Sequence, residues 1–182
     1  YLIEQIDGSF STSATTDSAG RTFLDSIPVG SYRITEKNVP SHVILSEIPQ
    51  EVYLEAGCTS TVTFFNAVKP SLTILKRNSV TGDPLSNAKF HIYYGSDNTT
   101  TGEINDLGVF TTASDGKITI TNVRPGSYII TEIKAPDGYL IDDPTRTITV
   151  TSGDTQTIVF KDTKPGGLII AVSYTHLRAH ET

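Results

Sequence analysis

The sequence predicts an all-β protein made of tandem antiparallel β-sandwich domains. Short stretches alternate between apolar and polar residues, as in strands with one buried face, and none shows the period of a helix. Gly, Pro, Asn and Asp punctuate these stretches at the close spacing that joins strands through turns. A long internal repeat then indicates that the same domain occurs more than once.

The complete copy is expected to run from Lys69 to Pro165. Its first two strands are predicted at residues 71–78 and 88–94, and a polar loop follows them. Residues 109–123 are interpreted as a hairpin that turns at Asp115 and Gly116. A strand at residues 127–133 and a last hairpin at residues 146–162 complete a set of about seven strands, which is typical of a β-sandwich.

The repeat has a constant offset of 96 residues, for example 132 − 36 = 96. It aligns "AGRTFLDSIPVGSYRITEKNVPSHVIL" with "DGKITITNVRPGSYIITEIKAPDGYLI", and "TVTFFNAVKP" with "TIVFKDTKPG". Such a period is too long for a solenoid unit and fits an array of independent domains. Residues 1–68 are therefore expected to be an incomplete copy that lacks its first strands, and residues 166–170 to begin a third copy.

The C-terminal residues 171–182 are expected to be non-native. The stretch "VSYTHLRAHET" breaks the pattern of the preceding chain and looks like a translated sequencing adapter. Targeting and artificial segments are set aside before a fold is argued. At the other end, the chain begins in mid-pattern and without Met, so the true N-terminus is expected to lie upstream.

Charge and composition argue against several classes of function. The net charge is −6 and no run of Lys or Arg is present, which argues against a nucleic-acid partner. The longest apolar runs are only a few residues, so no membrane insertion is expected from this fragment. Cys58 is the single cysteine and cannot form an internal disulfide, and neither a metal nor a cofactor is expected.

Three titratable residues occupy positions where the strand alternation calls for apolar side chains. Lys76 follows Leu72 and Ile74, Glu132 follows Tyr128 and Ile130, and Asp162 follows Ile158 and Phe160. Charged groups in a core are costly unless they are paired or neutralised. The first copy repeats part of this pattern with Glu36 and Asn66, and the strand for its lysine is expected before residue 1.

Two interpretations of this cluster follow from the residues. One is a buried Lys76–Asp162 ion pair with Glu132 as a hydrogen-bonding neighbour, a motif that gives little evidence of stability. The other is a reaction. An amine attacks only when neutral, and free lysine is neutral in about one molecule in two thousand at pH 7. Burial disfavours the charged forms of both amines and carboxyl groups, which would promote attack on a carboxyl group.

The chain resembles the Cna B-type, or SpaA-like prealbumin, domains of Gram-positive surface adhesins and pilins. The matching motifs are "SLTILKRNSVTGDPLSNAKF", "PGSYIITEIKAPDGYL" with the features of the pilin E-box, and "TIVFKD". The resemblance implies an immunoglobulin-like fold that holds a self-formed isopeptide bond. It makes Lys76 the nucleophile, Asp162 the acyl partner and Glu132 the catalytic acid. The first copy departs from it, because "EKNVPSHV" lacks the Gly-Tyr of the E-box.

The resemblance implies a structural stalk or pilus-type repeat, extracellular and anchored to the cell wall of a Gram-positive bacterium. Its expected partners are neighbouring domains of the same chain, while a host matrix protein or glycan would be bound by other domains. Bond formation would be a single-turnover step, so no enzyme in the usual sense is expected. One alternative is a ligand-binding adhesin module, which would need an exposed aromatic patch from Tyr93, Tyr94 and Tyr139. Another is an accessory β-sandwich of a secreted enzyme.

Overall fold

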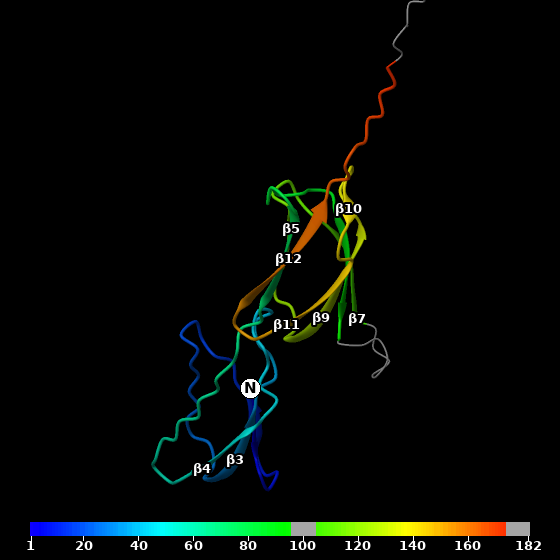
Figure 1. Ribbon diagram of the computed structural model, residues 1–182. Helices are drawn as coiled ribbons and strands as arrows, with labels where there is room; N and C mark the ends of the chain where they lie inside the picture. The colour runs from blue at the N-terminus through cyan, green and yellow to red at the C-terminus, as the bar shows by residue number, and fades with distance from the viewer. Residues whose placement is uncertain (96–104, 174–182) are drawn as a thin grey trace, which may run out of the picture.

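A computed structural model describes residues 1–95 and 105–173, with only the backbone described for Asn105. The polar loop at residues 96–104 and most of the tail thought to be non-native lie outside the described residues. Within them the chain forms strands and no helix, which confirms the all-β prediction. Figure 1 shows two strand-containing units, followed by an extended segment at the C-terminal end. The predicted domain limits at residues 68 and 165 remain predictions.

Two four-stranded sheets form the second unit. One has the order β10-β12-β5-β8 and the other β11-β9-β6-β7. Their bounds are β5 Ser71–Asn78, β6 Lys89–Tyr94, β7 Asn105–Thr111, β8 Lys117–Ile120, β9 Gly126–Lys134, β10 Leu140–Ile141, β11 Thr145–Val150 and β12 Thr155–Thr163.

The core lies between these two sheets, as a β-sandwich requires. Alternate residues of each strand point inward, because successive side chains of a strand lie on opposite faces. One buried cluster contains Leu72, Ile74 and Phe160 from the first sheet together with Phe90 and Ile130 from the second. The inward faces predicted from the alternation are therefore correct for β5, β6, β9 and β12.

The first and last strands of this unit lie side by side and run parallel. β5 pairs with β12 over eight residues, from Ser71 opposite Thr155 to Asn78 opposite Asp162. The other strand pairs of the unit are antiparallel. The sandwich prediction thus holds with one parallel pair, and this pair joins the strands at which the chain enters and leaves the unit.

Both predicted hairpins are wrong in their pairing. β7 lies next to β6 and β8 next to β5, so the turn at residues 113–116 connects the two sheets. In the same way β11 pairs with β9 while β12 pairs with β5. The turn at Asp115 and Gly116 was predicted at the correct place. Alternation tells which face of a strand is buried, but it does not tell which strand lies alongside.

Gly116 makes the turn before β8 possible. Its φ is +69°, and a Cβ added there would lie 2.6 Å from the carbonyl oxygen of Lys76 and 2.8 Å from the nitrogen of Leu85. The carbonyl of Gly116 also accepts a hydrogen bond of 2.7 Å from the Lys76 nitrogen. The turn therefore fixes the backbone of β5 at Lys76.

Replacing Gly116 with Ala should lower the free energy of unfolding by about 2 kcal/mol or more, because left-handed strain and a backbone clash add together. Gly138→Ala is the matched control, since φ is +82° there and no atom lies within 4 Å. It should cost only the strain, about 1 kcal/mol. Denaturant unfolding of both variants measures the difference. Equal losses would show that the space around Gly116 is not restricted.

The first unit has one four-stranded sheet with the order β2-β1-β3-β4. Its strands are β1 Leu2–Gln5, β2 Ser11–Ser13, β3 Gly30–Thr35 and β4 Gln50–Leu54. This sheet matches β7-β6-β9-β11 of the second unit, because Ile3 pairs with Ile34 as Ile92 pairs with Ile130.

One strand departs from the constant offset. Ile34 on β3 and Ile130 on β9 are 96 positions apart in the sequence (130 − 34). Their strand partners, Ile3 and Ile92, are only 89 positions apart (92 − 3). The connection after Ile92 is therefore seven residues longer than the one after Ile3. As a result Tyr1 corresponds to Phe90, an equivalence hidden by the constant offset.

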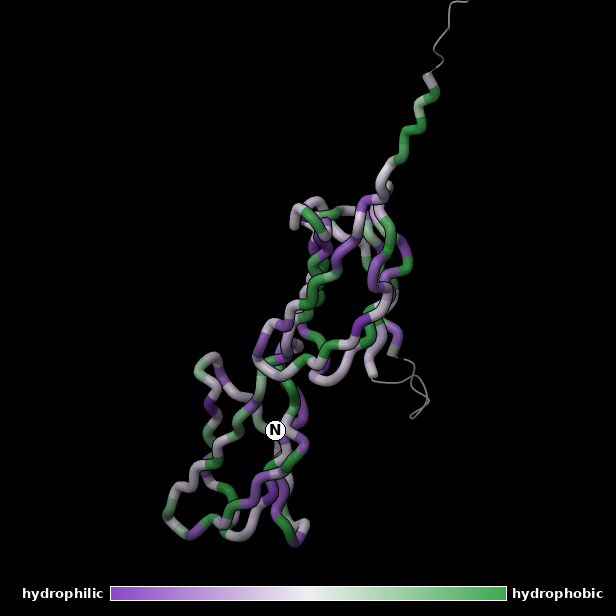
Figure 2. Tube along the Cα trace, viewed as in Figure 1, coloured by the Kyte–Doolittle hydropathy of each residue, from purple (hydrophilic) through white to green (hydrophobic). Residues whose placement is uncertain are grey.

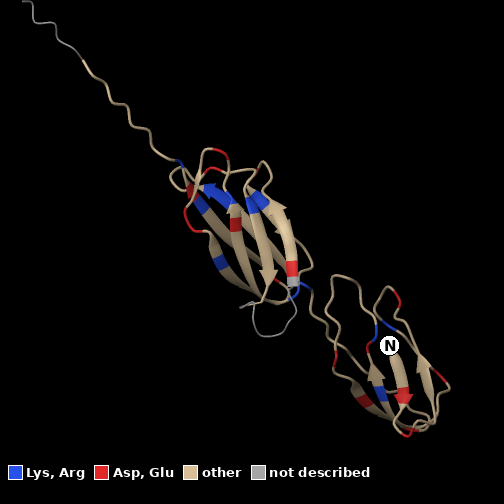
Figure 3. Ribbon diagram, turned by 90° about the vertical axis from the view of Figure 1, so that its right-hand side faces the viewer, with Lys and Arg blue, Asp and Glu red and all other residues tan. Residues whose placement is uncertain are grey.

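Charged residues and one apolar segment are the main features of the surface. Acidic and basic residues are interspersed along strands and loops (Figure 3). The segment after β12 is apolar and exposed at Leu168, Ile169 and Ile170, seen as the green stretch leading away in Figure 2. Across the described residues there is no helix of the length and apolarity needed to cross a membrane.

Candidate functional site

Three strands bring Lys76, Glu132 and Asp162 together in the core of the second unit. Lys76 on β5 and Asp162 on β12 belong to adjacent strands of one sheet. Lys76 pairs with Phe160, and Asp162 follows two residues later on the same inward face. Glu132 reaches them from β9 in the opposite sheet. All three predicted site residues therefore meet at one place.

The lysine amine lies between the two carboxyl groups. Lys76 Nζ donates a hydrogen bond of 2.5 Å to Glu132 Oε2, and it also contacts Asp162 Oδ1. The exposed fractions are 0% for Lys76, 3% for Glu132 and 0% for Asp162. Water is thus excluded from the cluster, and the low local dielectric strengthens the electrostatic interactions among the three side chains.

The carboxyl groups are poorly satisfied in this arrangement. Glu132 Oε1 and Asp162 Oδ2 have no hydrogen-bond partner among the described residues, and Asp162 Oδ1 has only its contact with the Lys76 ammonium. A buried acceptor without a partner costs about 1–3 kcal/mol. One cation facing two carboxylates would also leave a net negative charge in the core. Keeping all three side chains ionised in the core therefore costs free energy.

Glu132 relieves part of this cost by holding a proton. Burial raises the pKa of Glu132 to about 7; the nearby Lys76 ammonium opposes this rise, and the nearby Asp162 carboxylate adds to it. Near neutral pH the side chain therefore exists in both forms. A carboxyl group in this state can donate a proton and take it back, which is what an acid–base catalyst must do.

One aromatic ring lies near the lysine amine and a second ring packs on the first, and neither was predicted from the sequence to be part of the site. Lys76 Nζ lies 5.9 Å from the ring centroid of Phe90, whose ring lies 4.9 Å from that of Phe160. The Phe90 ring can stabilise a cation through its face. The inward parity of both rings was visible in the sequence, but the distance of Phe90 from the amine was not.

The first unit contains a related cluster without a lysine. Glu36 is buried, and its Oε1 accepts hydrogen bonds from Asn66 Nδ2 at 2.7 Å and from the Tyr1 hydroxyl at 3.1 Å. Its Oε2 accepts a further bond of 2.8 Å from the Ser46 nitrogen. Glu36 and Asn66, the predicted equivalents of Glu132 and Asp162, thus lie together. Tyr1 and Ser46 were not foreseen, because the seven-residue difference masks the equivalence of Tyr1 and Phe90.

The two glutamates differ in protonation. Burial would raise the pKa of Glu36, but the hydrogen bonds from Ser46, Asn66 and Tyr1 together outweigh it, so its pKa lies below the ordinary value. Glu36 therefore stays ionised at neutral pH. Glu132, whose pKa burial raises to about 7, is only partly ionised at that pH.

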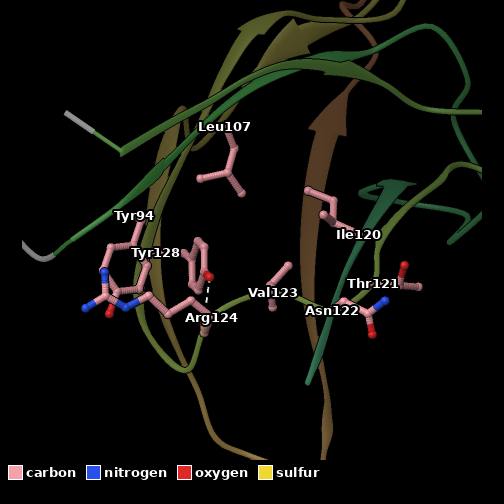
Figure 4. Close-up of a pocket in the computed structure, with 8 residues that line it drawn as sticks. All are labelled: Tyr94, Leu107, Ile120, Thr121, Asn122, Val123, Arg124 and Tyr128. Atoms are coloured by element: carbon pink, nitrogen blue, oxygen red, sulfur yellow. Dashed lines mark hydrogen bonds between the residues drawn. The ribbon is translucent and has the colours of Figure 1, made fainter. Parts of the chain in front are cut away.

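A pocket of about 300 Å³ opens where β6 ends and β9 begins (Figure 4). The Arg124 guanidinium stacks 4.6 Å from the Tyr94 ring centroid. The Tyr94 hydroxyl donates to the Pro125 carbonyl at 3.0 Å and that of Tyr128 to the Arg124 carbonyl at 2.6 Å. Burial raises the pKa of Tyr128 to about 12. The polar atoms of both tyrosines are therefore engaged internally.

The tyrosines considered for a binding patch are only partly exposed. Tyr93 stacks on His91 and hydrogen bonds to its Nδ1 at 2.9 Å, and the Tyr139 hydroxyl accepts a bond of 3.2 Å from Asn78. Tyr94 is packed as described above. Within residues 1–95 and 105–173, no group of three His, Cys, Asp or Glu side chains could hold a metal ion.

The model of the family described as SpaA, a prealbumin-like fold domain, matches residues 2–68 and again residues 70–164. The chain belongs to this family. Both units are thus SpaA-type domains, which agrees with the sandwich of the second unit and the matching sheet of the first. No curated protein matches the sequence.

Several solved structures are similar to the chain. The TIE protein of Bacillus anthracis is 23% identical with a TM-score of 0.49; the match covers 90% of this chain and 30% of that one. GBS52, the minor pilin of Streptococcus agalactiae, is 19% identical with a TM-score of 0.47, covering 91% and 73%. The pilus 2b backbone protein of group B streptococcus is 15% identical with a TM-score of 0.48, covering 90% and 77%. The chain thus spans less than a third of the TIE protein.

Proposed function

We propose that residues 69–165 form a stalk or pilus-type module of a cell-wall-anchored Gram-positive surface protein, locked by a self-formed amide between Lys76 and Asp162. The observation that carries the proposal is the fully buried amine held between two carboxyl groups from three strands. Membership of the SpaA family supports a structural role at such a surface. The proposed partners are neighbouring domains of the chain, and a host ligand would be bound elsewhere in the protein.

The proposed reaction uses only these three side chains. A proton passes from the Lys76 ammonium to the adjacent Asp162 carboxylate, which leaves a neutral amine and a carboxylic acid. Nζ then attacks Cγ of Asp162, the new C–N bond forms, and a C–O bond breaks. Glu132 donates a proton to the departing oxygen and takes one from the nitrogen, so one water leaves and Glu132 is regenerated.

The product explains why such a cluster would be retained. A neutral amide replaces one cation and one carboxylate, so the cost of burying two charges disappears. Asp162 no longer needs hydrogen-bond donors for two carboxylate oxygens. The reaction runs once in each molecule, so the protein is a structural element with a maturation step and no turnover.

The arrangement of the strands suits a module under tension. Force that enters at Ser71 runs along β5 to Lys76, crosses the amide to Asp162 on the neighbouring strand, and leaves after Thr163. Since β5 and β12 are parallel, the entry and exit points lie at opposite ends of the pair. The residues between Lys76 and Asp162 are bypassed and carry no load.

Pulling on the chain by its ends should test this role. The bonded domain should not release the 86 residues between positions 76 and 162 (162 − 76), a length of about 300 Å when extended. The Lys76→Met variant should release that length in single-molecule force spectroscopy. Release by the unmutated domain would refute the tension-bearing role.

A further inference from the structure

The segment that connects β9 to β11, residues 135–144 and called the strap below, contacts the strands of the reactive cluster. It begins directly after β9, and it ends at Pro144, whose carbonyl accepts a hydrogen bond of 2.6 Å from the Glu132 nitrogen. Between these points β10 pairs with the end of β12, with Ile141 opposite Asp162. Figure 1 shows β10 in yellow beside the arrowhead of β12. The strap is therefore attached at both of the strands that carry the carboxyl groups.

Tyr139 attaches the strap to the third strand through Asn78. Asn78 follows Lys76 on the inward face of β5, and it lies opposite Asp162 in the parallel register. Its Oδ1 accepts hydrogen bonds of 2.8 and 3.2 Å from two backbone nitrogens of the turn that follows. Its Nδ2 donates a bond of 3.2 Å to the Tyr139 hydroxyl. The hydroxyl thus links the strap to β5 beside the residues that are to react.

The end of β12 is held on both sides, because β5 and β10 flank it. The Ser79 nitrogen donates to the Asp162 carbonyl at 2.9 Å. The Ser79 hydroxyl lies 2.9 Å from that of Thr163, which donates a bond of 2.6 Å to Asp142 of the strap. Asp162 is fully buried although it lies one residue before the end of its strand. These contacts limit how far Asp162 can move away from Lys76.

The first unit forms the same turn without a tyrosine. At the offset of 96, Val43 stands at the position of Tyr139. The Val43 nitrogen donates to the Pro40 carbonyl at 2.9 Å, as the Tyr139 nitrogen donates to the Pro136 carbonyl at 3.1 Å. The turn therefore does not require a hydroxyl at this position, and formation of the turn does not account for the bond between Tyr139 and Asn78.

We propose that Tyr139 is a positioning residue for amide formation. By holding Asn78 it keeps the ends of β5 and β12 together, and the Lys76 amine then stays within reach of the Asp162 carboxyl carbon. Tyr139 acts through Asn78 and neither gives nor takes a proton. This inference rests on the proposed function, because it concerns the rate of that reaction. A displacement of about 1 Å between reacting groups can cost about 10²-fold in rate, so a modest loosening is measurable.

The test follows amide formation in the full chain. Protein synthesised in vitro is collected in denaturant before it folds and is then diluted into buffer near neutral pH. Circular dichroism reports folding and mass reports the loss of water, so the rate is taken from molecules that are already folded. Tyr139→Phe removes only the hydroxyl and should slow the loss of water about tenfold. Tyr93→Phe, which removes a hydrogen bond of 2.9 Å to His91 in the same unit, should leave the rate unchanged.

Asn78→Ser breaks the same contact from the other side. Serine keeps an oxygen for the turn after β5 but is too short to reach Tyr139. It should slow the reaction about as much as Tyr139→Phe, and the double variant should be no slower than either single variant. Two substitutions that break one shared bond are non-additive in this way.

The pH dependence of the rate gives a readout that a purely structural role would not move. Among the described residues, the charged groups that face Glu132 are Lys76 on β5 and Asp162 on β12, and its partner Phe90 on β6 is uncharged. The rate should fall as Glu132 loses its proton, near its pKa of about 7. The Asp162 carboxylate adds to this raised pKa, so a looser Asp162 in Tyr139→Phe should move the fall to lower pH.

Three results would overturn the role of Tyr139: loss of water from Tyr139→Phe at the unmutated rate, slowing without a shift of the pH profile, or additive effects of the two substitutions. A full sequence mass for the unmutated chain at all times is a different outcome. It would refute the proposed function, and this inference with it, before any variant is compared.

Discussion

Replacing Lys76 with Met should lower the melting temperature of the second unit by about 20 °C or more. The bond closes a loop of 86 residues (162 − 76), and a crosslink of that span stabilises a domain by roughly 4–5 kcal/mol in the chain-entropy model. Each kcal/mol corresponds to about 4–8 °C for a domain of this size. The substitution also removes the charged partner of opposite sign that the buried Asp162 contacts.

Lys161→Met is the matched control, because Lys161 lies on β12 next to Asp162 in sequence but is exposed. It should change the melting temperature by no more than a few degrees, as surface substitutions usually do. Calorimetry of the three proteins at one pH and concentration measures both effects. Similar melting curves for the unmutated chain and Lys76→Met would mean that no covalent crosslink stabilises the fold.

Replacing Glu132 with Gln should slow amide formation by about 10²–10⁴-fold, the usual contribution of a positioned acid–base group. The amide side chain has the same shape and can still accept a hydrogen bond from Lys76, but it cannot pass a proton. Freshly folded Glu132→Gln protein should therefore keep the water that the unmutated chain loses.

The Glu132 experiment needs a time course of mass after dilution from denaturant. Glu55→Gln, at an exposed position, should lose water at the rate of the unmutated chain. Loss of water from Glu132→Gln at the same rate would show that Glu132 only fills space between the sheets. Its raised pKa would then reflect its burial and have no part in the chemistry.

The positions of the site residues could be predicted from the sequence because strand parity determines which face is buried. Lys76, Glu132 and Asp162 each extend an apolar face, and all three lie in the core. The same rule could not predict that the turn at Gly116 joins two sheets, since parity carries no information about neighbouring strands. The pairing of β5 with β12 was likewise beyond the pattern, although it decides how force would cross the domain.

The details that separate the two units depend on three-dimensional contacts. The constant offset of the repeat identified Glu36 and Asn66. It did not identify Tyr1, because the strand that follows Tyr1 is offset from its counterpart by seven residues fewer. Burial raises the pKa of each glutamate, and the hydrogen-bond donors around it then decide how far that rise is offset. Three donors keep Glu36 ionised, while Glu132 has one oxygen without a partner and a pKa of about 7. No pattern of residue types gives these counts.

The intact mass of the chain tests the central claim most directly. Formation of the amide between Lys76 and Asp162 releases one water, so the folded protein should be lighter than its sequence by that amount. A protease digest should then contain one branched species that joins the peptide of β5 to that of β12. Lys76→Met and Asp162→Ala should each show the full mass of their sequences. A full sequence mass for the folded, unmutated chain at neutral pH would contradict the account and leave a buried ion pair at this site.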